Sequence, residues 1–469
     1  MTEPHELTAV EQAAAIRARE LSPVELARHY LARIDKFDHQ IGAFAAVARD
    51  AAINAAVDAE RAIAEGVDVP PLHGVCTAIK DLNFVAGMPA AFGSAAFPGF
   101  VPDFDDNVTT LVRRANMVIL GKTTTAELGA ACYTETAVAP PARTPWDTTR
   151  SAGGSSGGAG AAVATGLVSL AHGSDSAGSV RIPASVCGLV GLKPSRGRIS
   201  SGPLSGETTG LFANGVLART VLDAATMLDA LAVPMPGDPF ALPAEPGFAD
   251  RARNFRGRLR IARFATPVIP DVVVDGECLE AWEATSRVLE ALGHHVEDIP
   301  NPFPPDVRAV FRTLFSTGAA TIPLEPAQVG ALQPFTAWLR EQGEQLSAVQ
   351  LTRAVTAAQQ ISRRVAVALA DYDAVLTPTL AQPPAPVGHF RALATPEEEF
   401  DEQARFNPFT PLYNLTGQPA ITVPAHWSRD GLPIGVMVAA KQRQEATLLG
   451  LAHQLEEELN WHMRRPPTW

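Results

Sequence analysis

The chain has 469 residues, 46% hydrophobic and 19% charged, a composition typical of a globular protein with a large buried core. Its formal net charge of −12, without basic runs interleaved with aromatic residues, argues against nucleic acid and anionic membranes as partners. Four widely spaced cysteines indicate neither a zinc site nor a disulfide framework, and the polar N-terminus does not resemble a secretory signal, so a cytoplasmic location is expected.

The first part of the chain, from about residue 8 to 66, is rich in Ala, Glu and Arg and predicts two or three helices. In the stretch "LSPVELARHYLARI", Ser22 is a typical N-cap residue. Leu26, Tyr30 and Ile34 then recur at helical spacing. A helix that begins after Ser22 and buries these three side chains is expected.

From Leu72 onward, short apolar runs bounded by Gly and Pro alternate with helical segments, which predicts an α/β sheet. Helical sequence dominates from residue 306 to 370, and three further apolar runs follow before a closing helix at about 445 to 458. We expect one domain over residues 1–469, made of a helical segment (1–66), a central core (72–232) and the remainder of the sheet with pocket-forming helices (248–469).

One stretch is crowded with serine and glycine: "SAGGSSGGAGAAVATGLVSLAHGSDSAGSVRIP", from Ser151 to Pro183. A phosphate-binding loop needs Lys-Ser/Thr after its last glycine, where this chain has alanine. A dinucleotide-binding loop needs a strand before Gly153, where "PWDTTRSA" has the composition of a loop. A flexible linker would not continue into the apolar run "AAVATGLVSLA". None of these three interpretations suits the stretch.

A nucleophile elbow is the fourth interpretation, because residues 153–157 match G-x-S-x-G. That elbow also requires a preceding strand, which the sequence does not offer. What remains is a serine nucleophile whose base is not histidine.

The segment "GGSSGGAGAAVATGLVSLAHGSDSAGSVRIPASVCGLVGLKPSRGR" resembles the central motif of the amidase signature family. The segments "HGVCTAIKDL", "LGKTTTAELG", "TPWDTTRSAGGSSGG", "LTGQPAITVP" and "GLPIGVMV" resemble the same family in the same order. This resemblance covers most of the chain from about Leu72. It implies an α/β fold with a large mixed central sheet flanked by helices on both faces. It also implies hydrolysis of amide C–N bonds, without a metal or an organic cofactor.

The resemblance implies a catalytic set of Lys80, Ser155 and Ser179. In that family a cis peptide precedes the middle serine, here between Gly154 and Ser155; this serine relays a proton from the nucleophile, Ser179, to the lysine. Lys80 follows the apolar run "VCTAI", so burial is expected to lower its pKa toward that of a neutral base. Asp81 is expected on the opposite face of the strand, where it need not pair with this ammonium.

The residues that precede the expected nucleophile are small or polar, "DSAG". The backbone N–H groups of Ser176, Ala177 and Gly178 are expected to stabilise the oxyanion that forms on the substrate. Asp175 and Arg181 are expected to brace this loop rather than to react.

Two departures from common family text bear on the substrate. The chain has Ala177 and Ile182 in "AGSVRIP" where amidotransferase A-type subunits are expected to have "GGSIRQP", and Met437 stands where glutamine is frequent. The sequence is instead similar to amidases that act on nylon-oligomer and other xenobiotic amides. The stretch from Gly129 to Tyr133, which includes Ala130, is expected near the acyl pocket. Its small apolar residues favour bulky hydrophobic amides, anilides, esters or carbamates (urethanes).

The expected partner is therefore a small-molecule amide or carbamate, bound by a monomer or homodimer. An amidotransferase-type subunit that works with partner subunits stays open as an alternative. So does a catalytically inactive, interaction-only member of the same fold.

Overall fold

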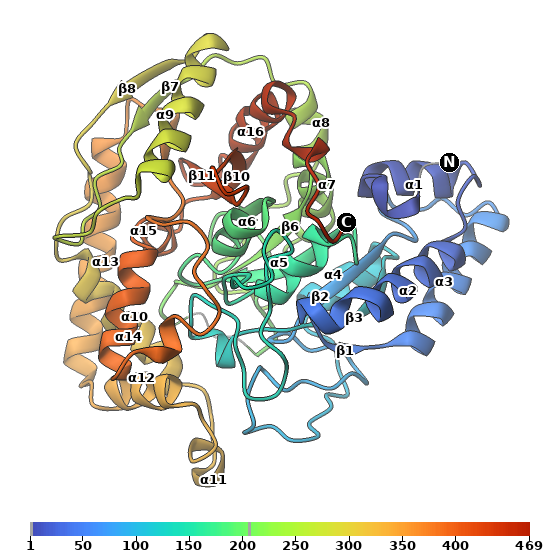
Figure 1. Cartoon of the computed structure of the whole chain (residues 1–469), viewed down its shortest axis with the longest axis horizontal. Coiled ribbons are helices and arrows are strands. Elements are labelled where there is room, and N and C mark those ends of the chain that lie inside the picture. Colours follow the sequence, from blue (N-terminus) through green and yellow to red (C-terminus); the bar gives the residue numbers. More distant parts are fainter. Residues whose placement is uncertain (1–2, 205–207) are drawn as a thin grey trace.

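The computed structural model describes residues 3–204 and 208–469 and places two β-sheets in the interior (Figure 1). In the larger sheet all neighbours are antiparallel except β9, β7 and β8, which run parallel. The sequence prediction of an α/β protein with a large mixed sheet is confirmed. Its eight strands lie in the order β4 (Leu170–Asp175), β6 (Ala213–Ala218), β5 (Val190–Lys193), β10 (Ala420–Trp427), β11 (Pro433–Ala440), β9 (Ala374–Pro378), β7 (Arg260–Arg263) and β8 (His295–Asp298).

Helices cover both faces of this sheet. Successive side chains of a strand point to opposite faces, and here they enter two different hydrophobic cores. On β6, Val216 and Ala218 lie in the larger core, whereas Leu217 between them lies in the second core. Helices that contribute to the larger core include α7 (Val221–Leu231), α8 (Phe248–Arg253), α9 (Gly276–Ala291) and α16 (Glu445–Leu459). Those that contribute to the second core include α5 (Gly157–Ala164) and α6 (Arg181–Cys187).

The smaller sheet has three strands in the order β1 (Phe44–Val47), β3 (Val118–Thr123) and β2 (Cys76–Lys80). Strand β2 also lies beside β4 of the larger sheet. The Thr77 hydroxyl donates to the Leu170 carbonyl (3.2 Å), and the Lys80 backbone N–H donates to His172 Nδ1 (3.4 Å). The sequence predicted strands in this region but not their separation into a second sheet.

The N-terminal helices follow the sequence prediction: α1 (Ala9–Arg17), α2 (Pro23–Ile41) and α3 (Arg49–Ala64). The Ser22 hydroxyl caps α2 by accepting the N–H groups of Val24 and Glu25. The Val10 N–H at the start of α1 donates to Asp223 Oδ1 on α7 (3.0 Å). Because this segment packs on the body of the molecule, we propose that it belongs to one domain with the rest of the chain.

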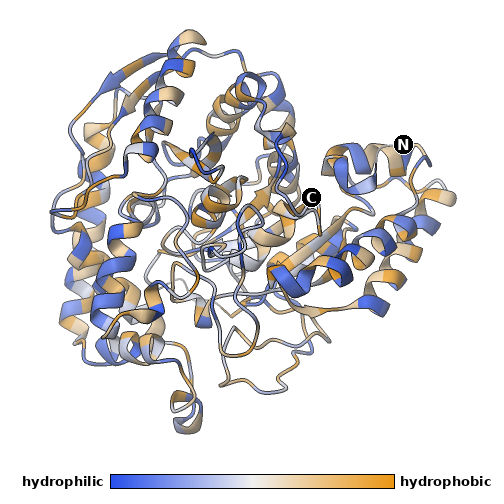
Figure 2. Cartoon of the chain, in the orientation of Figure 1, coloured by the Kyte–Doolittle hydropathy of each residue, from blue (hydrophilic) through white to orange (hydrophobic). Residues whose placement is uncertain are grey.

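A layer of helices lies beside the larger sheet, at the lower left of Figure 1. Hydrophilic residues alternate with hydrophobic ones along its outer helix α13 (Figure 2). The layer consists of α10 (Val307–Ala320), α11 (Pro326–Val329), α12 (Pro334–Glu344), α13 (Ala348–Ala368), α14 (Pro396–Phe406) and α15 (Thr410–Thr416).

The remaining helix, α4 (Asn107–Arg114), precedes β3. Within residues 3–204 and 208–469 there are also four short 3₁₀ helices: η1 (Pro4–Glu6), η2 (Glu127–Gly129), η3 (Phe390–Ala392) and η4 (Trp461–Met463). In the part of the chain that the structure describes, no helix has both the length and the apolar character needed to cross a bilayer.

Candidate active site

Lys80 ends strand β2 with its side chain fully buried. Its Nζ donates to Ser155 Oγ at 2.7 Å and to the Ser174 carbonyl at 3.3 Å. Burial lowers the pKa of Lys80 to about 7, although the Asp175 carboxylate acts in the opposite direction. A neutral amine is therefore accessible here at neutral pH, and its nearest polar partner is a serine hydroxyl.

Ser155 lies in the turn before α5, and the Gly154–Ser155 peptide is cis. Gly154 packs directly on the backbone of Tyr133, where a Cβ atom would lie only 2.6 Å from the Tyr133 carbonyl. The position therefore requires glycine. Tight packing of the two segments holds Ser155 at the end of the Lys80 side chain.

Ser179 lies just before α6 and lines an apolar cavity. Gly178 before it has φ 116°, and a Cβ atom there would lie 2.0 Å from Thr410 Oγ1. Glycine is required on both grounds, because this φ suits no other residue and the space is already occupied. The segment thereby brings the Ser179 side chain to the cavity.

A buried ion pair between Asp175 and Arg181 links the two ends of this segment. Arg181 Nε and Nη2 donate to Asp175 Oδ2 and Oδ1 at 3.0 and 2.9 Å, and neither side chain is exposed to solvent. Asp175 also accepts the N–H groups of Gly178 and Val180. Burial alone would raise the pKa of Asp175, but the Arg181 guanidinium outweighs it and holds that pKa well below its usual value.

Three further braces come from a segment that the sequence interpretation did not assign. Asn414 Nδ2 donates to the backbone carbonyl and to Oδ1 of Asp175, both at 2.9 Å. Asn407 Nδ2 and Thr410 Oγ1 both donate to the Ala177 carbonyl, at 2.7 and 2.6 Å. Asn414 directly precedes the segment "LTGQPAITVP", which resembles the family. That position was the available sequence signal for its role.

Met437 also contacts this brace. Its Sδ lies 3.3 Å from Arg181 Nη1 and accepts a hydrogen bond from it. The departure from glutamine noted in the sequence thus places a thioether, a weak acceptor, against the buried guanidinium.

The three N–H groups expected to stabilise an oxyanion are not equivalent. Gly178 donates its N–H to Asp175 Oδ1 at 2.7 Å. Because one N–H cannot serve two acceptors equally well, Gly178 is engaged in bracing the turn. Ser176 and Ala177 are left as the candidate donors of the expected three.

The cavity beside Ser179 encloses about 780 Å³ of space, including part of its open mouth. Its walls are mostly apolar, and four phenylalanines from α10, α12 and α14 contribute to them: Phe311, Phe315, Phe335 and Phe400. Gly129 and Ala130 also line it, and Ala130 packs in a cluster with Phe335 and Phe400. The shape and lining suit an uncharged, bulky group.

Tyr133 does not lie among the residues that line this cavity. Its hydroxyl donates to Glu399 on α14 at 2.6 Å, and its ring stacks on Phe390 with 5.3 Å between the ring centroids. Gln403, one turn further along α14, accepts the Cys132 N–H at 2.8 Å. Tyr133 and Cys132 therefore connect the 129–133 segment to α14 through these two hydrogen bonds.

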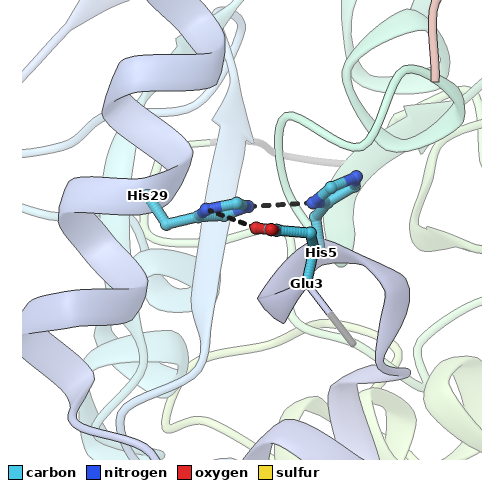
Figure 3. Close-up of side chains that lie close together, drawn as sticks. All are labelled: Glu3, His5 and His29. Atoms are coloured by element: carbon cyan, nitrogen blue, oxygen red, sulfur yellow. Dashed lines mark hydrogen bonds and ion pairs between the residues drawn. The ribbon is translucent and has the colours of Figure 1, made fainter. Parts of the chain in front are cut away.

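A group of possible metal ligands lies elsewhere, where the N-terminal segment meets α2 (Figure 3). His5 Nδ1 and His29 Nε2 are hydrogen bonded at 2.9 Å, and Glu3 lies 3.9 Å from His29 Nδ1. Burial and the neighbouring charges of Arg33 and Arg219 lower the pKa of His5 to about 3. The same positive charges oppose a bound cation. We therefore assign these side chains a structural role, in which they connect the N-terminal segment to α2.

Comparison with known proteins matches residues 25–449 to the family model described as Amidase. The acylamidase of Rhodococcus erythropolis is 34% identical over 98% of this chain and 97% of its own. The 6-aminohexanoate-cyclic-dimer hydrolase of Pseudomonas sp. (strain NK87) is also 34% identical, over 98% and 96%. The solved structure of a 6-aminohexanoate cyclic dimer hydrolase complexed with substrate superimposes with a TM-score of 0.90 at 31% identity, covering 99% of both chains.

The fold and these relatives define an amidase, an enzyme that hydrolyses amide C–N bonds. The chain belongs to the amidase signature family, as its motifs predicted.

Proposed function

We propose that this chain is a serine amidase in which Lys80, Ser155 and Ser179 form the catalytic set. The observation that carries the proposal is the 2.7 Å hydrogen bond between a buried lysine of lowered pKa and the Ser155 hydroxyl. The residue after Ser155 donates its N–H to the carbonyl of Ser179 at 3.2 Å, and Ser179 lines the cavity. A neutral Lys80 accepts the Ser155 proton, and Ser155 takes up the proton of Ser179.

The Ser179 oxygen then attacks the carbonyl carbon of the substrate. The N–H groups of Ser176 and Ala177 stabilise the tetrahedral oxyanion, an interaction worth about 2.7–4 kcal/mol for each donor. When the C–N bond breaks, the proton on Lys80 passes through Ser155 to the leaving amine. Water hydrolyses the acyl ester on Ser179, which releases a carboxylic acid and regenerates the enzyme.

We further propose that the acyl group or the leaving group is bulky and hydrophobic. The phenylalanine-lined cavity supports this preference, and so do two relatives named for acyl amides and a cyclic amide. Anilides, esters and carbamates present the same carbonyl to Ser179 and are included. Ile182 lines the cavity with an apolar side chain, which counts against a glutamine substrate and hence against the amidotransferase alternative.

A serine-reactive fluorophosphonate tests the proposal, because it labels only activated serines. We expect stoichiometric labelling of Ser179 in the folded protein and none in Ser179→Ala. A substrate panel is expected to show higher kcat/KM for a hydrophobic anilide than for glutamine. Absence of labelling would favour the inactive member of the fold, and a preference for glutamine would refute the hydrophobic substrate class.

The pH dependence of kcat/KM should report the titration of Lys80. Because the base must be neutral to accept a proton and its pKa is about 7, activity is expected to fall tenfold per pH unit below about pH 7. His172, whose Nδ1 accepts the Lys80 backbone N–H, has a pKa lowered to about 4 by burial, so it stays neutral through this range. A profile that is flat between pH 5 and 8 would exclude Lys80 as the base.

A further inference from the structure

A second buried lysine lies close to the site, and the proposed reaction does not use it. Lys122, on β3, is fully buried and forms an ion pair with Asp81 at 2.8 Å. Asp81 is 2% exposed and directly follows Lys80 in the chain. The residue directly after the proposed base, Lys80, therefore carries a buried carboxylate.

The strand register explains why this carboxylate does not pair with Lys80. In the parallel pair of β2 and β3, Ile79 lies opposite Lys122 and Lys80 lies opposite Thr123. Side chains alternate between the faces of a strand, so Ile79, Asp81 and Lys122 share one face. Lys80 points to the other face, where its Nζ donates to Ser155.

The hydrogen bonds of Asp81 fix it on its own face. Its Oδ1 accepts from Lys122 Nζ and its Oδ2 from the Ala91 N–H at 3.2 Å. Burial raises the pKa of Asp81, and the Lys122 ammonium counteracts that rise. Lys122 is thus the cation that compensates the charged form of this carboxylate.

Other titratable groups face these two lysines, and each has a defined partner. On the Lys80 side, β4 presents His172, which is neutral, and Asp175, which is paired with Arg181. On the Lys122 side, Asp106 at the start of α4 accepts from the Asn83 side chain and the Phe84 N–H. Lys122 is paired with Asp81 and not with Asp106 or Asp175.

We propose that Lys122 is a positioning residue for the amidase reaction: it holds the Asp81 carboxylate on the far face of β2, so that the Lys80 amine keeps Ser155 as its partner. This inference rests on the proposed role of Lys80 as the base. Without Lys122, an unpaired carboxylate next to Lys80 would stabilise the ammonium form. A protonated Lys80 cannot accept the Ser155 proton.

Lys122→Met tests this role through the pH profile of kcat/KM on a hydrophobic anilide. We expect the acid limb of the profile to move up by about one pH unit, because a nearby opposite charge raises the pKa of an amine by about that much or more. In Lys122→Met/Asp81→Asn, which removes the carboxylate as well, the limb is expected to return to its wild-type position. Lys122→Arg, which keeps the charge, is expected to leave the limb unshifted.

A merely structural role would reduce kcat in Lys122→Met without moving the limb, and removal of Asp81 would not reverse the defect. Either result overturns the proposal. Asp81→Asn alone provides an independent readout should Lys122→Met fail to fold: the unpaired Lys122 ammonium is expected to move the limb to lower pH, and an unmoved limb counts against the inference. Full activity of Lys80→Met would instead refute the proposed function itself.

Discussion

Lys80→Met is expected to lower kcat by about 10²–10⁴-fold, the usual contribution of general acid–base catalysis, while the protein stays folded. Methionine has a similar length, so the buried side chain is replaced without a large change in volume. The substitution also removes an amine that burial disfavours in its charged form. Stability should therefore be kept or increased while turnover is lost, which kcat measurements and urea denaturation on the same sample would show.

His172→Gln is the matched control, because His172 is also buried and contacts the Lys80 backbone. Its Nδ1 accepts the Lys80 N–H, and its Nε2 donates to Asn214 Oδ1 at 3.0 Å. These bonds join β2, β4 and β6, so we expect a loss of stability but a much smaller loss of kcat than for Lys80→Met. If His172→Gln abolished turnover and Lys80→Met did not, the base would be the histidine and the proposed mechanism would be wrong.

Arg181→Met is expected to destabilise the protein by about 3–5 kcal/mol, the usual effect of leaving one member of a buried ion pair without its partner. Asp175 would keep its backbone donors but lose both guanidinium hydrogen bonds. The pKa of Asp175 is lowered in the folded state, so its stabilising effect is present above the ordinary carboxyl pKa and lost as the pH falls through the folded value. Urea denaturation at pH 7 therefore measures the full difference.

Arg198→Met separates loss of stability from loss of catalysis. Arg198 is equally buried and pairs with Glu445 at 3.2 Å, but it does not line the cavity. We expect a comparable loss of stability in both variants, with kcat of the folded protein reduced about 100-fold only in Arg181→Met, because the misplaced nucleophile no longer meets the carbonyl. Equal kcat values in the two variants would show that the Asp175–Arg181 pair does not position Ser179.

The sequence predicted the sheet and the identity of the candidate residues because both leave local signals. Apolar runs between Gly and Pro mark the strands, and the length of the Gly/Ser-rich motif singles out Ser155 and Ser179. The meeting of Lys80 with Ser155, 75 positions later, depended on the family resemblance, because no local pattern encodes that contact.

Contacts between distant segments could not be predicted in the same way. Asn414 and Thr410 brace the Ser179 segment from more than 200 positions away, and no local pattern encodes these contacts, although Asn414 directly precedes a recognised family segment. The engagement of the Gly178 N–H by Asp175 depends on the exact turn geometry, which composition does not specify. From the sequence, Tyr133 is expected near the pocket, whereas its hydroxyl donates to Glu399 and the residue is absent from the cavity lining.

The hydrogen bonds from Asn407 and Thr410 to the Ala177 carbonyl span 230 and 233 positions of the chain. The Ser179 segment therefore depends on the C-terminal part of the protein for these contacts. A chain that ends before Asn407 would contain Lys80, Ser155 and Ser179 but lack the braces that Asn407, Thr410 and Asn414 supply.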